Sequence, residues 1–305
     1  MNQNEVLAAI AIRRQEVERR LDLLRIEKYS SNEPLSETIN YILAGEGKRV
    51  RGLLAVLCAE LYSQNFLHGI NAAMALEMIH AYSLAHDDLP CLDDDDMRRG
   101  RMSAHKMFDV PRALLAGDAL LTDAFWVLTA DADSTSPWSY APFCGAELKL
   151  RIVRELAIGA GGSGMVYGQM LDVHWTGKSD QVSLDILDRM HLEKTGALLG
   201  AACAMGALSG GANQREAEEM RHFGQQIGLA YQVVDDLLDS EAGTGKSVGK
   251  DVAQGKSTYV TTMGRDEARD RAASLTKEAL SFIKRFHDRG TLLNFFVSSL
   301  LDRKK

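Results

Sequence analysis

Two clusters of aspartate residues, about half a chain apart, are the parts of this sequence best suited to chemistry. The first lies between His80 and Arg101, and the second is DDLLD, Asp235 to Asp239. Each follows a long apolar stretch with helical spacing, so both clusters are expected at helix ends. Carboxylate oxygens are ligands that Mg²⁺ prefers, and Mg²⁺ in proteins is commonly shared with substrate phosphates. Together the clusters predict a magnesium site for a phosphorylated ligand.

The spacing within each cluster decides whether its carboxylates can act together. Asp235 and Asp239 are four residues apart, so on a helix they share one face and repel each other unless a cation lies between them. Asp87 and Asp93 are six apart, and a straight helix would separate them by about 9 Å along its axis and place them on different faces. Pro90 must end or kink the helix between them. We therefore expect Asp93 to fold back towards Asp87.

Basic residues gather at the same breaks in the helical pattern. Arg98 and Arg99 directly follow the first cluster. The other basic residues at such breaks are Lys48, Arg51, Lys194, Lys246 and Lys256. Carboxylates alone would suit a calcium site, whereas carboxylates combined with Arg and Lys indicate a ligand with dense negative charge, such as a diphosphate.

At these residues the sequence resembles the trans-isoprenyl diphosphate synthases, in particular the bacterial farnesyl diphosphate synthases. The combination of motifs is specific, although a lone DDxxD would be weak. The matching segments, in family order, are GEGKRVR (45–51), AYSLAHDDLPCLDDDDMRRG (81–100), LLAGDALLT (114–122), GQMLD (168–172), EKTGALL (193–199), AYQVVDDLLD (230–239) and GKSVGKDVAQGKST (245–258).

The resemblance implies a role for each matching residue. The ligands of three Mg²⁺ ions, with Mn²⁺ as a substitute, would be Asp87, Asp88, Asp93, Asp235, Asp236 and Asp239. The residues that bind isopentenyl diphosphate would be Lys48, Arg51, His80 and Arg99. The groups that hold the allylic diphosphate would be Arg98, Lys194, Lys246 and Lys256, of which Lys194 and Lys256 would also act in catalysis together with Thr195 and Gln232 beside the carbocation.

The resemblance also implies the reaction. Isopentenyl diphosphate would condense head to tail with dimethylallyl or geranyl diphosphate, in an enzyme that forms a homodimer. Tyr82 lies five residues before Asp87, about 7.5 Å down the helix axis, and Ser83 faces the same way as Asp87. In this family the product extends beside that helix, so an aromatic ring at Tyr82 resembles enzymes that stop at the fifteen-carbon farnesyl product.

Four other readings compete with farnesyl synthesis. A synthase of geranyl or geranylgeranyl diphosphate would share every motif. A terpene cyclase would need the first acidic cluster, but not Lys48, Arg51 and a second DDxxD. A non-catalytic partner subunit is disfavoured by the intact aspartates of both clusters. His86-Asp87 could be the pair of an all-α metal phosphohydrolase, which would leave the arginines and DDLLD unexplained.

Apolar residues at three- and four-residue steps predict helices almost throughout the chain, and no segment reads as a strand. We therefore expect an all-α isoprenoid-synthase bundle, a single domain over residues 1–305 with a central active-site cavity. The predicted helices cover residues 5–27, 34–44, 52–63, 70–89, 112–131, 146–175, 183–209, 214–239, 265–287 and 291–302.

Composition narrows the partners and the compartment. The chain has 305 residues, 46% hydrophobic, with a formal net charge of -7. This acidity disfavours a nucleic-acid partner, because phosphate binding would need a basic face. The four cysteines are widely spaced and form no CxxC pair, as expected for free thiols in the cytoplasm. The N-terminus does not read as a signal peptide, and no apolar run is long enough for a membrane span.

Overall fold

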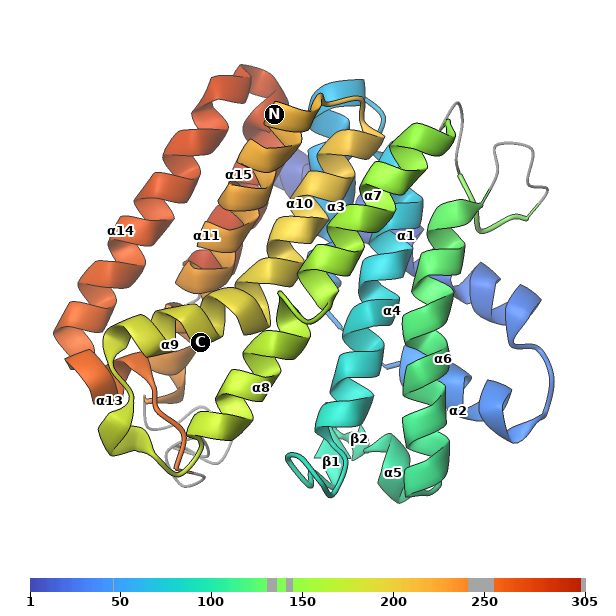
Figure 1. Cartoon of the computed structure of the whole chain (residues 1–305). Coiled ribbons are helices and arrows are strands. Elements are labelled where there is room, and N and C mark those ends of the chain that lie inside the picture. Colours follow the sequence, from blue (N-terminus) through green and yellow to red (C-terminus); the bar gives the residue numbers. More distant parts are fainter. Residues whose placement is uncertain (46, 131–135, 141–144, 241–254, 303–305) are drawn as a thin grey trace.

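The computed structural model describes residues 1–45, 47–130, 136–140, 145–240 and 255–302, and helices dominate this part of the chain (Figure 1). The elements in chain order are α1 (Gln3–Lys28), α2 (Pro34–Leu43), α3 (Val50–Ser63), η1 (Phe66–Gly69), α4 (Ile70–Asp87), β1 (Met97–Arg98), β2 (Arg101–Met102), α5 (Ala104–Met107), α6 (Val110–Thr129), α7 (Ala146–Ala160), α8 (Met165–Trp175), η2 (Ser179–Gln181), α9 (Leu184–His191), η3 (Leu192–Gly196), α10 (Ala197–Ser209), α11 (Gln214–Asp239), α13 (Tyr259–Met263), α14 (Arg265–Ile283), η4 (Lys284–Gly290) and α15 (Thr291–Leu301).

The all-α prediction is confirmed, with local corrections. The predicted helix 265–287 ends at Ile283 and is followed by the 3₁₀ segment η4. Two strands of two residues each, β1 and β2, pair as a hairpin where no strand was expected. The predicted helix 146–175 is two helices, because Gly161, Gly162 and Gly164 interrupt it and glycine costs about 1 kcal/mol in a helix interior. The predicted helix 183–209 is divided by the π-helical turn η3.

The helix α10 forms the centre of the bundle. Every residue from Ala197 to Leu208 is buried, and Figure 1 shows the helix between α11 and α7. Small residues let its neighbours approach closely. A side chain at Gly206 would collide with the backbone of Ala55 in α3, and one at Gly224 of α11 would collide with the backbone of Leu199. This tight packing holds α11, which carries the second acidic cluster, in a definite position.

The helix α4 leads into the first acidic cluster. Twelve of its residues are buried, so packing against its neighbours sets its position. It ends at Asp87, slightly earlier than predicted, and the chain then turns back through Pro90. The Asp93 N–H donates to the Asp87 carbonyl at 2.9 Å. The predicted return of Asp93 to Asp87 is therefore confirmed at the level of the backbone.

The hairpin follows this turn and carries the arginine pair. Met97 pairs with Met102, and Arg98 pairs with Arg101. Arg99 and Gly100 form the two-residue turn with φ values of 52° and 77°, as the favoured hairpin turns require. Because the strands are so short, this turn sets the direction in which the two arginine side chains leave the backbone.

Candidate active site

A central cavity of about 1540 Å³ lies between α1, α4, α11 and the two connecting segments that contain Lys48 and Asp93. It collects residues from motifs that are far apart in the sequence. The predicted site residues that line it are Lys48, Arg51, His80, Asp93, Arg98, Arg99, Thr195, Gln232, Asp235, Asp239 and Lys256.

One wall of the cavity is cationic. Burial lowers the pKa of His80 well below its usual value, and the neighbouring Arg51 and Arg99 lower it further. The Arg51 Nε has neither solvent access nor a hydrogen-bond partner among the described residues. A side chain at Gly47 would collide with the guanidinium group of Arg99, so this glycine lets Arg99 reach the wall. Such a wall suits an anion with several oxygens.

Glu77 is the buried counter-charge beneath this wall, and sequence reasoning missed it. Glu77 is 4% exposed. Its Oε1 accepts the Gly52 N–H at 2.9 Å, and its Oε2 lies 3.6 Å from Arg49 Nη1. Its negative charge also acts on Arg51 and Arg99, favouring their charged forms. The available signal was a single acid in the otherwise apolar run of α4, because an acid in such a position needs a partner.

The opposite wall is acidic. Asp235 and Asp239 both reach the cavity from the end of α11, and Asp93 reaches it from the loop after α4. Burial raises the pKa of Asp87 to about 6; Lys194 opposes this shift, and Asp93 adds to it. A cation in this region would favour the charged carboxylates. This set of oxygen donors fits Mg²⁺.

Asp88 and Asp236, two of the predicted metal ligands, make hydrogen bonds that position neighbouring segments. Asp88 accepts from Arg98 Nε at 2.9 Å and lines a second, smaller pocket. Asp236 accepts the Tyr259 N–H at 2.8 Å, which ties α13 to the end of α11. Their role as metal ligands stays a prediction, whereas their positioning contacts are observed.

The six aspartates do not form a preformed cage. Within the described ranges, one group of three potential ligand residues has its ligand atoms within 4.8 Å of one another, and it contains none of the six. Mg²⁺ is usually bound through one or two carboxylates, waters and substrate phosphates, and not by an all-protein cage. Carboxylates spread around a cavity are consistent with this mode of Mg²⁺ coordination.

A second group of cations lies beside the acidic wall. Lys194 stands in the π-helical turn η3 and donates to Asp172 Oδ2 at 2.5 Å. Lys256 Nζ lies 3.4 Å from Asp93 Oδ1 and 3.8 Å from Asp172 Oδ2. Burial would raise the pKa of Asp172, but Lys194 and Lys256 bring it below its usual value. Asp172 was matched only as part of GQMLD, and the structure shows that it positions both lysines.

Thr195 and Gln232, both expected beside the carbocation, contact each other on the cavity surface. The Thr195 hydroxyl donates to Gln232 Oε1 at 3.3 Å, and Gln232 Nε2 lies 3.4 Å from Asp236 Oδ1. The π-helical turn brings Thr195 to face α11; such turns often occur at functional sites. The pair places two uncharged dipoles on the cavity surface between the two charged walls.

Comparison with known proteins agrees with this geometry. A family model described as polyprenyl synthetase matches residues 32–295. The chain belongs to the polyprenyl synthetase family.

Relatives of the chain carry different products in their names. The chain is 38% identical over 274 residues to the farnesyl diphosphate synthase of Micrococcus luteus, and the match covers 89% of this chain and 90% of the relative. It is 44% identical over 253 residues to the chloroplastic geranylgeranyl pyrophosphate synthase 11 of Arabidopsis thaliana, covering 81% and 69%. A Helicobacter pylori geranyltransferase, solved in complex with magnesium and isoprenyl diphosphate, superposes with a TM-score of 0.75 at 28% identity, covering 96% of each chain.

The described predicted site residues that do not line the cavity are Asp87, Asp88, Lys194 and Asp236, treated above, together with Tyr82 and Ser83. Tyr82 is buried in the core, with its ring 5.6 Å from that of His86. The Ser83 hydroxyl donates to the His80 carbonyl at 3.0 Å. Lys246 lies outside the described residues. The chain-length role of Tyr82 and Ser83, and the diphosphate contact of Lys246, stay predictions.

Proposed function

We propose that this polyprenyl synthetase is a farnesyl diphosphate synthase, which condenses isopentenyl diphosphate with dimethylallyl and geranyl diphosphates. The observation that carries the proposal is the division of one cavity into a cationic wall and an acidic wall. A reaction between two diphosphates needs two anion sites, and only the allylic diphosphate must leave. The cationic wall suits the diphosphate that stays, and the acidic wall with its lysines suits the one that departs.

The residues of the cationic wall would bind isopentenyl diphosphate. Lys48, Arg51 and Arg99 supply positive charge, and His80 supplies ring nitrogens whose pKa is lowered by burial and by the nearby arginines. Glu77 holds the arginine cluster together from below. Charge-assisted hydrogen bonds to a phosphate are about twice as strong as neutral ones. These contacts orient the alkene towards the centre of the cavity.

The acidic wall would hold the allylic diphosphate. Asp87, Asp93, Asp235 and Asp239 would bind Mg²⁺, or Mn²⁺ in its place, and we propose three ions, with Asp88 and Asp236 completing the two motifs. The Helicobacter pylori relative, solved with magnesium and isoprenyl diphosphate, supports this. When bound, the metal supplies Lewis-acid neutralisation of the diphosphate oxygens. Arg98, Lys194, Lys246 and Lys256 would add positive charge around the same group.

The chain's own residues then suffice for the remaining chemistry. The allylic carbon–oxygen bond breaks as positive charge from Lys194 and Lys256 offsets the charge on the departing diphosphate. The Thr195 and Gln232 dipoles face the carbocation, and the cavity shields it from water. The isopentenyl alkene attacks the cation, which forms the new carbon–carbon bond. A proton then leaves the adduct for the departed diphosphate, so no protein nucleophile is required.

The decisive test is incubation of the purified chain with Mg²⁺, isopentenyl diphosphate and either dimethylallyl or geranyl diphosphate. We expect farnesyl diphosphate as the main product from both starters. Chain length is read by chromatography after removal of the diphosphate. Absence of any condensation product would overturn the proposal. A dominant twenty-carbon product would instead favour the second candidate, a geranylgeranyl diphosphate synthase, which the similarity to the Arabidopsis protein supports.

Tyr82→Ala is expected to shift the main product from fifteen to twenty carbons. Removing a buried aromatic ring opens space beside α4, and such a change costs about 3–5 kcal/mol of stability. Tyr82→Phe is the matched control. The Tyr82 hydroxyl has no hydrogen-bond partner among the described residues, so phenylalanine keeps the ring and should keep the farnesyl product. An unchanged product length in Tyr82→Ala would contradict the role of this ring.

We propose a single domain over residues 1–305. This is supported by one hydrophobic core cluster with members from Val17 to Leu301.

We also propose a homodimer in the cytoplasm. The homodimer is supported by the exposed apolar side chains of Leu114, Leu115 and Trp126 along α6. A cytoplasmic location is supported by the free thiols of Cys58, Cys91 and Cys203. Among the described helices, none is both long and apolar enough to cross a membrane.

A further inference from the structure

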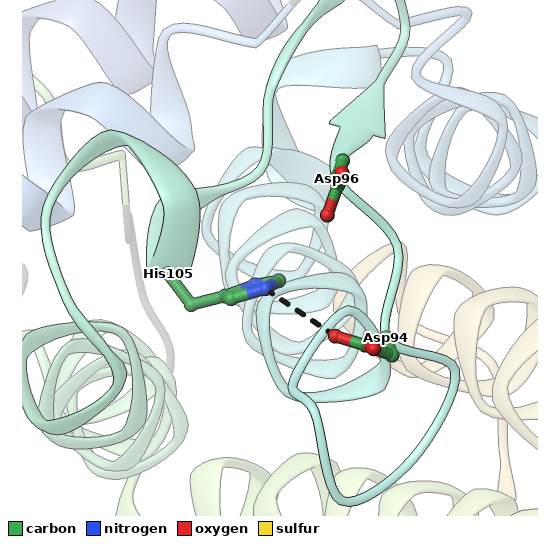
Figure 2. Close-up of side chains that lie close together, drawn as sticks. All are labelled: Asp94, Asp96 and His105. Atoms are coloured by element: carbon green, nitrogen blue, oxygen red, sulfur yellow. Dashed lines mark ion pairs between the residues drawn. The ribbon is translucent and has the colours of Figure 1, made fainter.

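Three side chains outside the central cavity form a compact group beside the hairpin. The possible ligand atoms of Asp94, Asp96 and His105 all lie within 4.8 Å of one another. Figure 2 shows the His105 ring pointing from α5 towards Asp94. Asp96 lies in the same loop as Asp94, directly before β1. None of the three lines the central cavity, whose surface includes Asp93 and Asp95 instead. The group is therefore separate from the diphosphate site.

His105 is the member that points to a ligand. The residue is only 6% exposed, and its Nε2 has neither solvent access nor a hydrogen-bond partner among the described residues. The Asp94 Oδ1 lies 4.0 Å from this nitrogen, beyond hydrogen-bond range. A buried polar group without a partner costs about 1–3 kcal/mol. An ion between the nitrogen and the carboxylate would remove that cost.

The other ring nitrogen of His105 is already held. Its Nδ1 lies 3.1 Å from the Ser103 hydroxyl. Histidines that bind metals usually make such a bond with the nitrogen that does not bind, because it sets the ring's tautomer and direction. With Nδ1 protonated and bonded to Ser103, the Nε2 lone pair faces the two aspartates.

The hairpin brings the two aspartates to His105. The Ser103 N–H donates to the Asp96 carbonyl at 2.9 Å, which places Asp96 opposite the segment that leads into α5. The Asp94 N–H donates to the Leu89 carbonyl at 3.2 Å, which ties Asp94 to the end of the α4 turn. Both carboxylates are exposed, with side chains 62% and 72% accessible. A small rotation can therefore adjust their oxygens.

We propose that Asp94, Asp96 and His105 bind one divalent transition-metal ion such as Zn²⁺. Imidazole with carboxylate ligands suits Zn²⁺, whereas Mg²⁺ prefers oxygen alone. With ligand distances of about 2.1 Å and tetrahedral geometry, two ligand atoms on one Zn²⁺ ion lie about 3.4 Å apart. The 4.0 Å between His105 and Asp94 and the 4.8 Å spread of the group must shorten on binding, which rotation of the two exposed carboxylates permits.

One existing ion pair involves a proposed ligand. Lys106 Nζ lies 2.9 Å from Asp96 Oδ1. A carboxylate has two oxygens and about four lone-pair positions, so Asp96 can serve both partners, and the accessible Lys106 side chain can also turn to solvent. Binding would join α5 to the loop that precedes Arg98 and Arg99, and would hold the hairpin in place.

Zn²⁺ titration of the chelator-treated full chain tests this site, with excess Mg²⁺ present to fill carboxylate-only sites. Isothermal calorimetry should show one Zn²⁺ equivalent in the unchanged chain. His105→Gln and Asp94→Asn should each weaken that equivalent by at least about 10-fold, since even outer-shell changes cost 10–100-fold in affinity. The exposed His174 on α8 provides a matched control, because His174→Gln should leave the equivalent intact.

The proposal would be overturned by no Zn²⁺ uptake in excess Mg²⁺, or by equal uptake by the unchanged chain and Asp94→Asn. Asp94 is exposed, so its substitution decides the matter even if the buried His105 proves necessary for folding, which circular dichroism would reveal. Asp235→Ala separates this site from the diphosphate site. The Zn²⁺ equivalent should persist in that variant, and its loss there would place the ion at the acidic wall instead. The outcome is independent of the proposed activity.

Discussion

Asp235→Ala is expected to lower kcat for condensation by about 1000-fold, the scale on which a preorganised charge at the reacting group contributes. Asp235 faces the cavity from α11, one turn before Asp239, on the acidic wall that also contains Asp93. Removing it takes away a carboxylate that would hold Mg²⁺ against the departing diphosphate. Steady-state rates at saturating substrate and Mg²⁺ measure the effect.

The same substitution should leave the fold intact. Like charges four residues apart on a helix destabilise it by about 0.2–0.5 kcal/mol, and alanine has a higher helix propensity than aspartate. Thermal unfolding followed by circular dichroism should therefore show no loss of helix. Glu218→Gln removes an exposed charge from the same helix and should keep full activity. A kcat for Asp235→Ala within tenfold of the unchanged chain would contradict the assignment of the acidic wall.

Arg51→Gln is expected to raise KM for isopentenyl diphosphate by about 100-fold, because loss of one member of a desolvated charge pair costs about 2–5 kcal/mol. The Arg51 Nε is enclosed by protein, and burial lowers the pKa of this guanidinium. The protein thus disfavours the charged form that an anionic substrate would favour.

The two substrates distinguish a local effect from a general one. KM for geranyl diphosphate should change little in Arg51→Gln, since that substrate is assigned to the acidic wall. Arg14 lines the same cavity but is exposed on α1. Arg14→Gln should change either KM by less than about twofold, because solvent screens exposed charges. An equal rise in both KM values for Arg51→Gln would refute separate diphosphate sites.

Local sequence signals predicted the parts of the site that depend on one helix or one turn. The four-residue spacing of Asp235 and Asp239 placed both on one face of α11, and both reach the cavity. Pro90 predicted the return of Asp93 to Asp87, which a backbone hydrogen bond now shows. These features follow from helix geometry and proline chemistry alone, so no knowledge of packing was needed.

Pairings between distant segments could not be predicted in this way. Asp172 bonds to Lys194, which lies 22 residues later, and Glu77 bonds to the backbone 25 residues earlier. Each contact depends on how two helices pack against each other. This packing produces no periodic pattern in the sequence. The π-helical turn at Lys194 and Thr195 could not be predicted either, because a shifted backbone hydrogen bond leaves no mark on the amino-acid composition.

The sequence by itself determined the helical class, the acidic and basic residues available, and the helix ends that carry them, because these depend on local spacing and composition. Only the tertiary structure decided which aspartates face the central cavity. Asp93, Asp235 and Asp239 line it, whereas Asp88 lines the smaller pocket and accepts a hydrogen bond from Arg98. The reason is that a carboxylate's partner is set by the packing of whole helices, and by a hairpin too short for any strand pattern to reveal.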